Sequence, residues 1–210
     1  MQISVYVDGF NLYYGAVRDS PYRWLDLYAL SCRLFPQHDI GRIRYFTARV
    51  RPTPTDPRKP QRQQTFIRAL ETIPCLSVHL GDFQSHPRRM PLADSAPDAP
   101  TFVTVIRTEE KGSDVNLASY LLVDGFKREY EMAVVVSNDS DLAEPIRLVR
   151  CELGLPVTVV NPHLDSPHPS YQLQKCASKC MNLWPGSLQA CQFPPTLRDA
   201  HGVIHKPAGW

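Results

Sequence analysis

Along the first 160 residues, short apolar stretches typical of strands alternate with longer stretches that are apolar on one side, as in helices. This pattern predicts strands that alternate with helices. Short continuous apolar runs at 3–7 and 132–137 predict strands buried on both faces. Apolar residues on one side of 114–127 predict an amphipathic helix. The same reasoning predicts further strands at 41–50, 76–80, 101–107 and 157–160, and further helices at 12–17, 25–35, 62–73, 141–153 and 171–183.

Alternating strands and helices predict an α/β fold with a mainly parallel central sheet and helices on both faces. We place this domain at residues 1–161. Beyond it the chain is rich in proline, so 162–210 is predicted to be a C-terminal extension, irregular from 185 onward, packed on or tethered to the domain. Residues 82–101 are rich in Pro, Asp, Ser and His and predict a long loop or flap.

Composition narrows the class of protein. At 210 residues the chain suits one full domain, and 43% hydrophobic and 21% charged residues are ordinary for a soluble globular protein. No apolar run approaches the ~20 residues that span a bilayer, and the N-terminus lacks a secretory signal pattern, so we expect no membrane contact and a cytoplasmic location. In that compartment the six cysteines are expected to be reduced.

Carboxylates stand at three informative places. Asp8 ends the first apolar run, Asp139 and Asp141 follow the run 132–137, and Asp114 opens the amphipathic helix. In an open parallel sheet, strand carboxyl ends and helix amino ends lie on the same edge, so these side chains are expected to converge. Grouped carboxylates repel one another unless a cation neutralises them. The arrangement therefore predicts a divalent-metal site and phosphodiester chemistry.

Three segments carry a family resemblance: residues 7–12 (VDGFNL), 111–117 (KGSDVNL) and 136–142 (VSNDSDL). In this order and at these separations they resemble the NYN family of the PIN-like nuclease superfamily, including its LabA-like branch. Each motif alone is common, and the specificity comes from finding all three at the predicted strand ends and helix start. The resemblance covers roughly residues 1–160.

The resemblance implies a three-layer, Rossmann-like PIN-like fold. It also implies a Mg²⁺- or Mn²⁺-dependent ribonuclease that hydrolyses phosphodiester bonds of single-stranded or structured RNA. By this carry-over Asp8, Asp114 and Asp139 would bind the metal, and Asp141 would join them as a catalytic residue or cap the following helix. We also consider six candidate substrate-binding residues. Asn11, Ser137 and Asn138 come from the motifs, Lys111 precedes the acidic helix, and Arg49 and Arg51 belong to a locally basic stretch that is otherwise a solvated face.

One position departs from the family pattern. Many relatives carry a second Asp six residues after the first on the central helix, and here Tyr120 occupies that place. This favours one metal ion over two. It also keeps open a different class of function, a non-catalytic PIN-like module that binds RNA or a protein partner. A homodimer, and a role as a toxin or defence effector, also stay open.

Other sites and classes are less well supported. Cys176, Cys180, Cys191, His201 and His205 include zinc-ligand types but lack paired C-x₂-C spacing, and helical packing of the first two is the simpler interpretation. The second Asp of a haloacid-dehalogenase phosphatase is replaced by Phe10. The sequence contains no nucleotide-binding phosphate loop, no dinucleotide fingerprint after the first strand and no G-x-S-x-G of a serine hydrolase.

Overall fold

The computed structural model describes residues 1–93, 101–166 and 168–210. Within them a seven-stranded sheet has the order β4-β3-β2-β1-β5-β6-β7, and all neighbours run parallel except β3 and β4. This confirms the predicted α/β class with a mostly parallel central sheet. The strands of this sheet are β1 (Gln2–Asp8), β2 (Asp39–Ala48), β3 (Leu76–Pro91), β4 (Phe102–Lys111), β5 (Met132–Val136), β6 (Val157–Asn161) and β7 (Lys179–Asn182).

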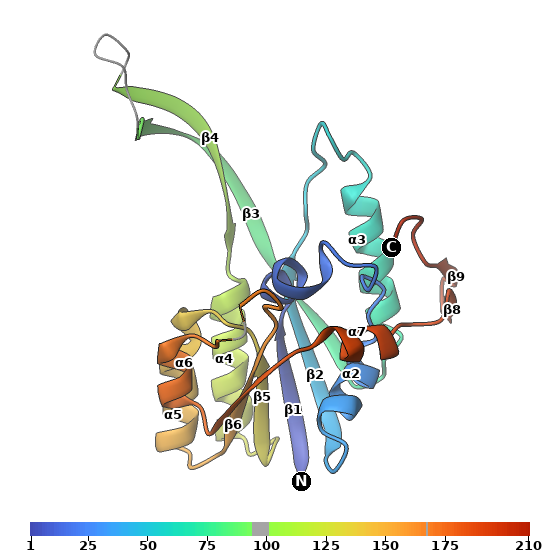
Figure 1. Cartoon of the computed structure of the whole chain (residues 1–210), viewed down its shortest axis with the longest axis vertical. Coiled ribbons are helices and arrows are strands. Elements are labelled where there is room, and N and C mark those ends of the chain that lie inside the picture. The colour runs from blue at the N-terminus through green and yellow to red at the C-terminus, as the bar shows by residue number, and fades with distance from the viewer. Residues whose placement is uncertain (94–100, 167) are drawn as a thin grey trace.

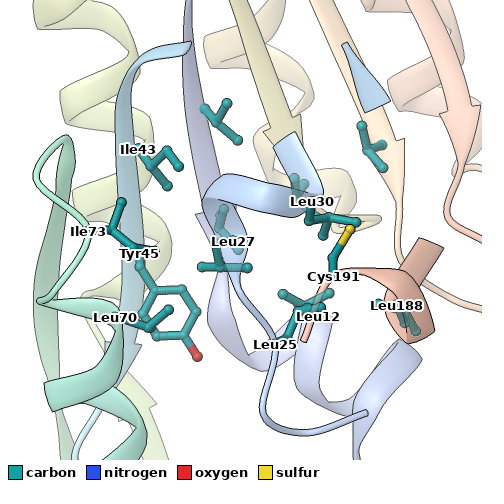
Figure 2. Packing of buried hydrophobic residues seen from close by; sticks show 14 of the residues in the cluster. Leu12, Leu25, Leu27, Leu30, Ile43, Tyr45, Leu70, Ile73, Leu188 and Cys191 are labelled. Carbon is teal, nitrogen blue, oxygen red and sulfur yellow. The ribbon is translucent and has the colours of Figure 1, made fainter. Parts of the chain in front are cut away.

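Helices cover both faces of the sheet (Figure 1). Along β1 the side chains alternate between two apolar clusters, with Val5 and Val7 in one and Tyr6 in the other. The first cluster includes Leu30 of α2 (Figure 2), and the second includes Leu121 of α4. The helical elements are α1 (Gly9–Leu12), the π-helical turn η1 (Tyr13–Val17), α2 (Leu27–Leu34), α3 (Lys59–Leu70), α4 (Ser113–Phe126), the 3₁₀ turn η2 (Ser140–Leu142), α5 (Ala143–Cys151), α6 (Tyr171–Cys176) and α7 (Pro185–Ala190).

The predicted loop at 82–101 is wrong over much of its length. Strand β3 runs on to Pro91 and pairs with β4 in an antiparallel hairpin that projects from the domain (Figure 1). Beyond Gln84 the side chains of β3 are exposed on both faces, so the sequence there has no apolar alternation to signal a strand. Residues 94–100 of the predicted loop lie outside the described residues.

The predicted helix at 171–183 is also wrong beyond its first half. Helix α6 ends at Cys176, and β7 follows as a short edge strand parallel to β6. Residues 185–210 are more regular than expected, because they form α7 and a separate hairpin of β8 (Thr196–Asp199) and β9 (Gly202–His205). The division of the chain at residue 161 stays a prediction, although β7 extends the central sheet beyond it.

A buried ion pair ties α4 to the sheet. The side chain of Asp124 is 3% exposed, and it accepts hydrogen bonds from the Tyr6 hydroxyl at 2.7 Å and from Arg44 at 2.7 and 2.9 Å. Burial alone would raise the pKa of Asp124, but the bonds from Arg44 and Tyr6 outweigh it and hold the pKa below its ordinary value. The network therefore fixes α4, and with it Asp114, against the strands. Among the described residues, no helix combines the length and apolarity that crossing a membrane requires.

Candidate active site

A cavity of about 280 Å³ opens where the carboxyl ends of the strands meet the start of α4. Four carboxylates from three separate parts of the chain line it. Asp8 comes from the end of β1, Asp139 from the turn after β5, Asp114 from the first turn of α4, and Glu110 from the base of the projecting hairpin. The remaining lining residues are Phe10, Asn11, Tyr14, Phe83 and Ser113. The structure thus brings together three of the four predicted catalytic carboxylates.

Asp8 is 5% exposed and held on both oxygens. Its Oδ1 accepts from the backbone N–H of Asn11 at 2.9 Å, and its Oδ2 accepts from the Ser137 hydroxyl at 2.9 Å. Burial and the charge of Asp139 raise the pKa of Asp8, although these hydrogen bonds oppose the rise. Gly9 follows because a Cβ there would lie 2.6 Å from the carbonyl oxygen of Phe46. The close approach of β2 therefore requires a glycine directly after the buried carboxylate.

Asp139 is fixed by the turn between β5 and α5. Its backbone N–H donates to Ser137 Oγ at 3.1 Å, and its Oδ1 accepts from the backbone N–H of Asp141 at 3.0 Å. The carboxylate therefore caps the 3₁₀ turn η2 while it also lines the cavity. Asp141 itself is exposed and does not line the cavity, so the structure separates it from the other three predicted catalytic residues.

Asp114 stands in the negative field of three other carboxylates. Glycine at position 112 takes φ +100°, a conformation that favours glycine, and lets α4 begin directly after β4. The pKa of Asp114 is raised from 3.8 to about 6. Burial is the largest cause, and the charges of Asp8, Asp139 and Glu110 add to it. In the absence of a cation, this carboxyl therefore keeps its proton at pH values above those at which an ordinary aspartate ionises.

Glu110, which the sequence led us to regard as mainly solvated, also lines the cavity. It accepts from the backbone N–H of Ser113 at 3.0 Å and from its hydroxyl at 2.7 Å, so it caps α4 from the preceding strand. The sequence held one signal, a Glu three residues before the Ser-Asp that opens the helix. Its place in the cavity depends on the β3–β4 hairpin, which the sequence pattern did not predict.

The predicted substrate-binding residues have different surroundings. Asn11 Oδ1 accepts from the backbone N–H of Asn138 at 2.9 Å and lies 3.0 Å from His163 Nε2, so Asn11 joins two loops beside the cavity. Asn138 Oδ1 in turn accepts a hydrogen bond from the backbone N–H of Ser170 at 2.6 Å. Ser137 is fully buried and serves as the hydrogen-bonding link between Asp8 and Asp139.

The basic candidates lie outside the cavity lining. Lys111 is exposed and pairs with Glu109 at 3.3 Å. Arg51 donates to the carbonyl oxygen of Phe83 at 2.9 Å and to Ser85 Oγ at 3.3 Å, which places it at the base of the hairpin. Arg49 is exposed. None of these cations neutralises the carboxylates of the cavity.

The donor chemistry of the cavity fits a hard divalent cation, because carboxylate oxygens are the ligands that Mg²⁺ and Mn²⁺ prefer. Yet across residues 1–93, 101–166 and 168–210 no three His, Cys, Asp or Glu side chains form a group placed to hold a metal ion. These two observations agree for an ion that takes few protein ligands and keeps several waters, as Mg²⁺ does. Asp8, Asp114 and Asp139 line the cavity and are the candidates for those few ligands.

Tyr120 lies away from the cavity. Its ring is 4.2 Å from that of His79 (centroid to centroid), and the guanidinium of Arg44 lies 4.3 Å from its ring centroid. The cluster packs α4 against the sheet, so the aspartate expected here in many relatives is replaced by a packing residue. The zinc candidates are separated as well, because Cys176 and Cys180 pack in one core cluster and Cys191 in the other.

Comparisons with known proteins place the chain in a family. The model of the NYN domain matches residues 2–183. The chain belongs to the NYN domain family. The 6-hydroxy-3-succinoylpyridine 3-monooxygenase of Pseudomonas putida is 27% identical to this NYN protein over 236 residues, which cover 100% of this chain and 75% of that protein. A solved structure of a protein of unknown function from Vibrio parahaemolyticus shares the fold with a TM-score of 0.55 and 17% identity, over 88% of this chain and 93% of that one.

Proposed function

We propose that this NYN-domain protein is a metal-dependent endoribonuclease that hydrolyses RNA phosphodiester bonds at the carboxylate cavity. The observation that carries the proposal is the cavity itself. Asp8, Asp114 and Asp139 come from three motifs far apart in the sequence and line one cavity at the carboxyl edge of the sheet. The NYN family supports a nuclease-like function, and the choice of RNA over DNA rests on the family resemblance.

The carboxylates of the cavity would bind a cation, and neighbouring groups hold two of these carboxylates in place. Hydrogen bonds fix Asp8 and Asp139 in rigid positions, and Asp114 projects from a helix start into the same negative field. A bound Mg²⁺ or Mn²⁺ would supply positive charge to a phosphate oxygen and make a bound water more acidic. The neighbouring carboxylates that help to raise the pKa of Asp114 also favour a cation in the cavity, and binding of that cation would release the proton.

The surroundings suit a nucleic-acid strand. Phe10, Tyr14 and Phe83 line the same cavity and offer aromatic faces on which bases stack. Arg51 stands at the base of the hairpin, whose described part also carries Arg88, Arg89 and Arg107. We propose that RNA passes along this hairpin into the cavity. In the non-catalytic alternative, the protein would bind RNA along the same surface, or a protein partner, without cleaving it.

Closed circular RNA tests the endonuclease directly, because a circle has no ends for an exonuclease. With Mn²⁺ or Mg²⁺ the protein is expected to linearise single-stranded circular RNA, and with EDTA to leave it intact. A single-stranded DNA circle of the same sequence is the matched control for sugar preference. Binding of the RNA circle without cleavage under every metal condition would refute the catalytic proposal and leave the binding module.

A second candidate function follows from the Pseudomonas relative, whose name describes a monooxygenase that acts on a substituted pyridine. The observation that favours it is the extent of the likeness, which covers the whole of this chain. A monooxygenase inserts one oxygen atom of O₂ into its substrate and reduces the other to water with two electrons from a donor, for which NADH can be supplied in the assay. Consumption of O₂ and NADH that depends on added 6-hydroxy-3-succinoylpyridine would establish it, and their absence would set it aside.

Several finer assignments stay predictions. They are the LabA-like branch, the cytoplasmic location, a homodimer or protein partner, and a toxin or defence role. Their tests are independent of the cavity chemistry.

A further inference from the structure

A second cavity, of about 290 Å³, lies beside the carboxylate site and is used by none of the chemistry above. It is bounded by the residues after β1, the end of β2, the start of α3 and Trp210. Phe10 and Tyr14 line both cavities, so the two sites are neighbours. Its volume is at the lower end of the range for small-molecule sites, roughly 300–1,000 Å³.

Aromatic rings form the inner wall of this second cavity. The rings of Tyr45 and Phe66 meet edge to face at 6.2 Å, and those of Phe66 and Trp210 meet at 5.8 Å. Figure 2 shows the hydroxyl of Tyr45 pointing away from Ile43 and Ile73 of the core. Burial raises the pKa of the Tyr45 phenol, and the charge of Asp8 adds to this, so Tyr45 is a neutral hydrogen-bond donor. Such a wall suits a flat ring with a polar substituent.

Cations outnumber acids around the opening. Four cationic and two acidic side chains line the cavity, and the acids are already engaged, Asp19 with Arg18 and Asp56 with Arg62. The other two cations are Arg23 and Lys59. Arg23 donates from Nε at 2.8 Å and from Nη2 to the backbone carbonyl of Arg18, and from Nη1 to that of Gly209 at 3.5 Å, so its partners are neutral carbonyls. Across the described residues, neither Arg23 nor Lys59 has a carboxylate partner within ion-pair distance.

We propose that this cavity binds a planar aromatic molecule that carries a carboxylate or phosphate group. The ring would pack against Phe66 and Trp210, and the anionic group would face Lys59 and Arg23, where charge-assisted hydrogen bonds are strong. Two sources share this chemistry, a small aromatic acid and a nucleotide. The inference does not depend on the proposed nuclease, because it needs neither a metal nor a scissile phosphate.

Calorimetric titration of the full chain in EDTA tests this proposal apart from any catalysis. The probes are pyridine-3-carboxylate and uridine 5′-monophosphate, each compared with its uncharged counterpart, pyridine-3-carboxamide and uridine. We expect at least one anionic probe to bind with a Kd at least ~10-fold below that of its neutral counterpart, since one charge-assisted bond is worth about that factor or more. Binding of the carboxylate identifies a small acid as the ligand, and binding of the monophosphate identifies a nucleotide.

Two variants locate the binding. Lys59→Gln is expected to weaken the anionic probe ~10-fold, whereas Arg58→Gln, an exposed cation next to it that does not line the cavity, is the matched control and should bind as the wild type does. Phe66→Leu should weaken the anionic and neutral probes alike. No binding of either anionic probe at millimolar concentration, or equal affinity of Lys59→Gln and wild type, would overturn the proposal. Failure of RNA cleavage would leave this result unaffected.

Discussion

Replacing Asp114 with asparagine is expected to stabilise the metal-free protein at pH 8, which is unusual for a substitution within a folded domain. The substitution removes a carboxylate from the field of Asp8, Asp139 and Glu110, which together with burial raises its pKa from 3.8 to about 6. The side chain is only partly buried, so asparagine fits without a new cavity. The gain therefore comes from charge, and it must depend on pH.

The sign follows from proton linkage. Between the ordinary pKa of aspartate and about 6, the folded protein keeps a proton on Asp114 that the unfolded chain has released. Stability therefore falls as pH rises through this window, and the loss is complete above it. A rise from 3.8 to about 6 corresponds to ~3 kcal/mol at most. Solvent screening of this partly exposed group reduces the figure to ~1–2 kcal/mol. Loss of the helix-start carboxylate offsets ~0.3–1 kcal/mol of it.

Urea denaturation in EDTA at pH 4.5 and pH 8 measures the effect. We expect Asp114→Asn to gain ~1 kcal/mol over wild type at pH 8, or roughly 2–4 °C in Tm for a chain of this size, and distinctly less at pH 4.5. Glu144→Gln is the matched control, because Glu144 is an exposed first-turn carboxylate whose pKa is lowered by a hydrogen bond from Arg147. The control should gain nothing at pH 8. A destabilised Asp114→Asn protein at pH 8, or the same gain at both pH values, would refute the reasoning.

Three further predictions concern the metal, the buried ion pair and the turn after β1. In scanning calorimetry, millimolar Mn²⁺ should raise the Tm of wild type at pH 8 but not that of Asp139→Asn. The rise should become smaller below pH 6. Equal Tm shifts in both proteins would argue against the metal site. Arg44→Met should cost ~3–5 kcal/mol in urea denaturation because it leaves the 3%-exposed Asp124 carboxylate without its main partner; a cost below ~1 kcal/mol would show that Tyr6 and solvent compensate. Gly9→Ala should cost ~1–3 kcal/mol, since its Cβ would lie 2.6 Å from Phe46 O, and a neutral result would mean that the turn shifts freely.

The sequence predicted best where burial dictates pattern. The strands β1 and β5 are continuous apolar runs buried on both faces, and α4 has a clear apolar side, so their positions and the convergence of Asp8, Asp114 and Asp139 followed from periodicity and topology. In a parallel sheet the carboxyl ends of the strands lie at one edge. Motifs that are far apart in the sequence could therefore be predicted to lie together.

Prediction failed where the chain is exposed or where distant segments meet. The outer part of β3 is exposed on both faces, so no alternation marked it. A strand was predicted at 101–107, but its pairing with β3 and the place of Glu110 in the cavity were not. Strand β7 is a four-residue edge strand, and the i, i+4 spacing of Cys176 and Cys180 suggested a helix instead. The second cavity depends on Trp210 packing against Phe66, a contact that no local pattern contains.

Cleavage of end-labelled single-stranded RNA in Mn²⁺ by wild type, Asp139→Asn and Glu144→Gln tests the central claim most directly. The introduced asparagine keeps an oxygen to accept the hydrogen bond that Asp139 Oδ1 takes from the backbone of Asp141, so the variant removes the charge and preserves the turn. We expect wild type and Glu144→Gln to cleave and Asp139→Asn to lose more than ~100-fold, since even outer partners of metal ligands cost 10–100-fold. Cleavage by Asp139→Asn at the wild-type rate, or no cleavage by wild type, would contradict a nuclease at the carboxylate cavity.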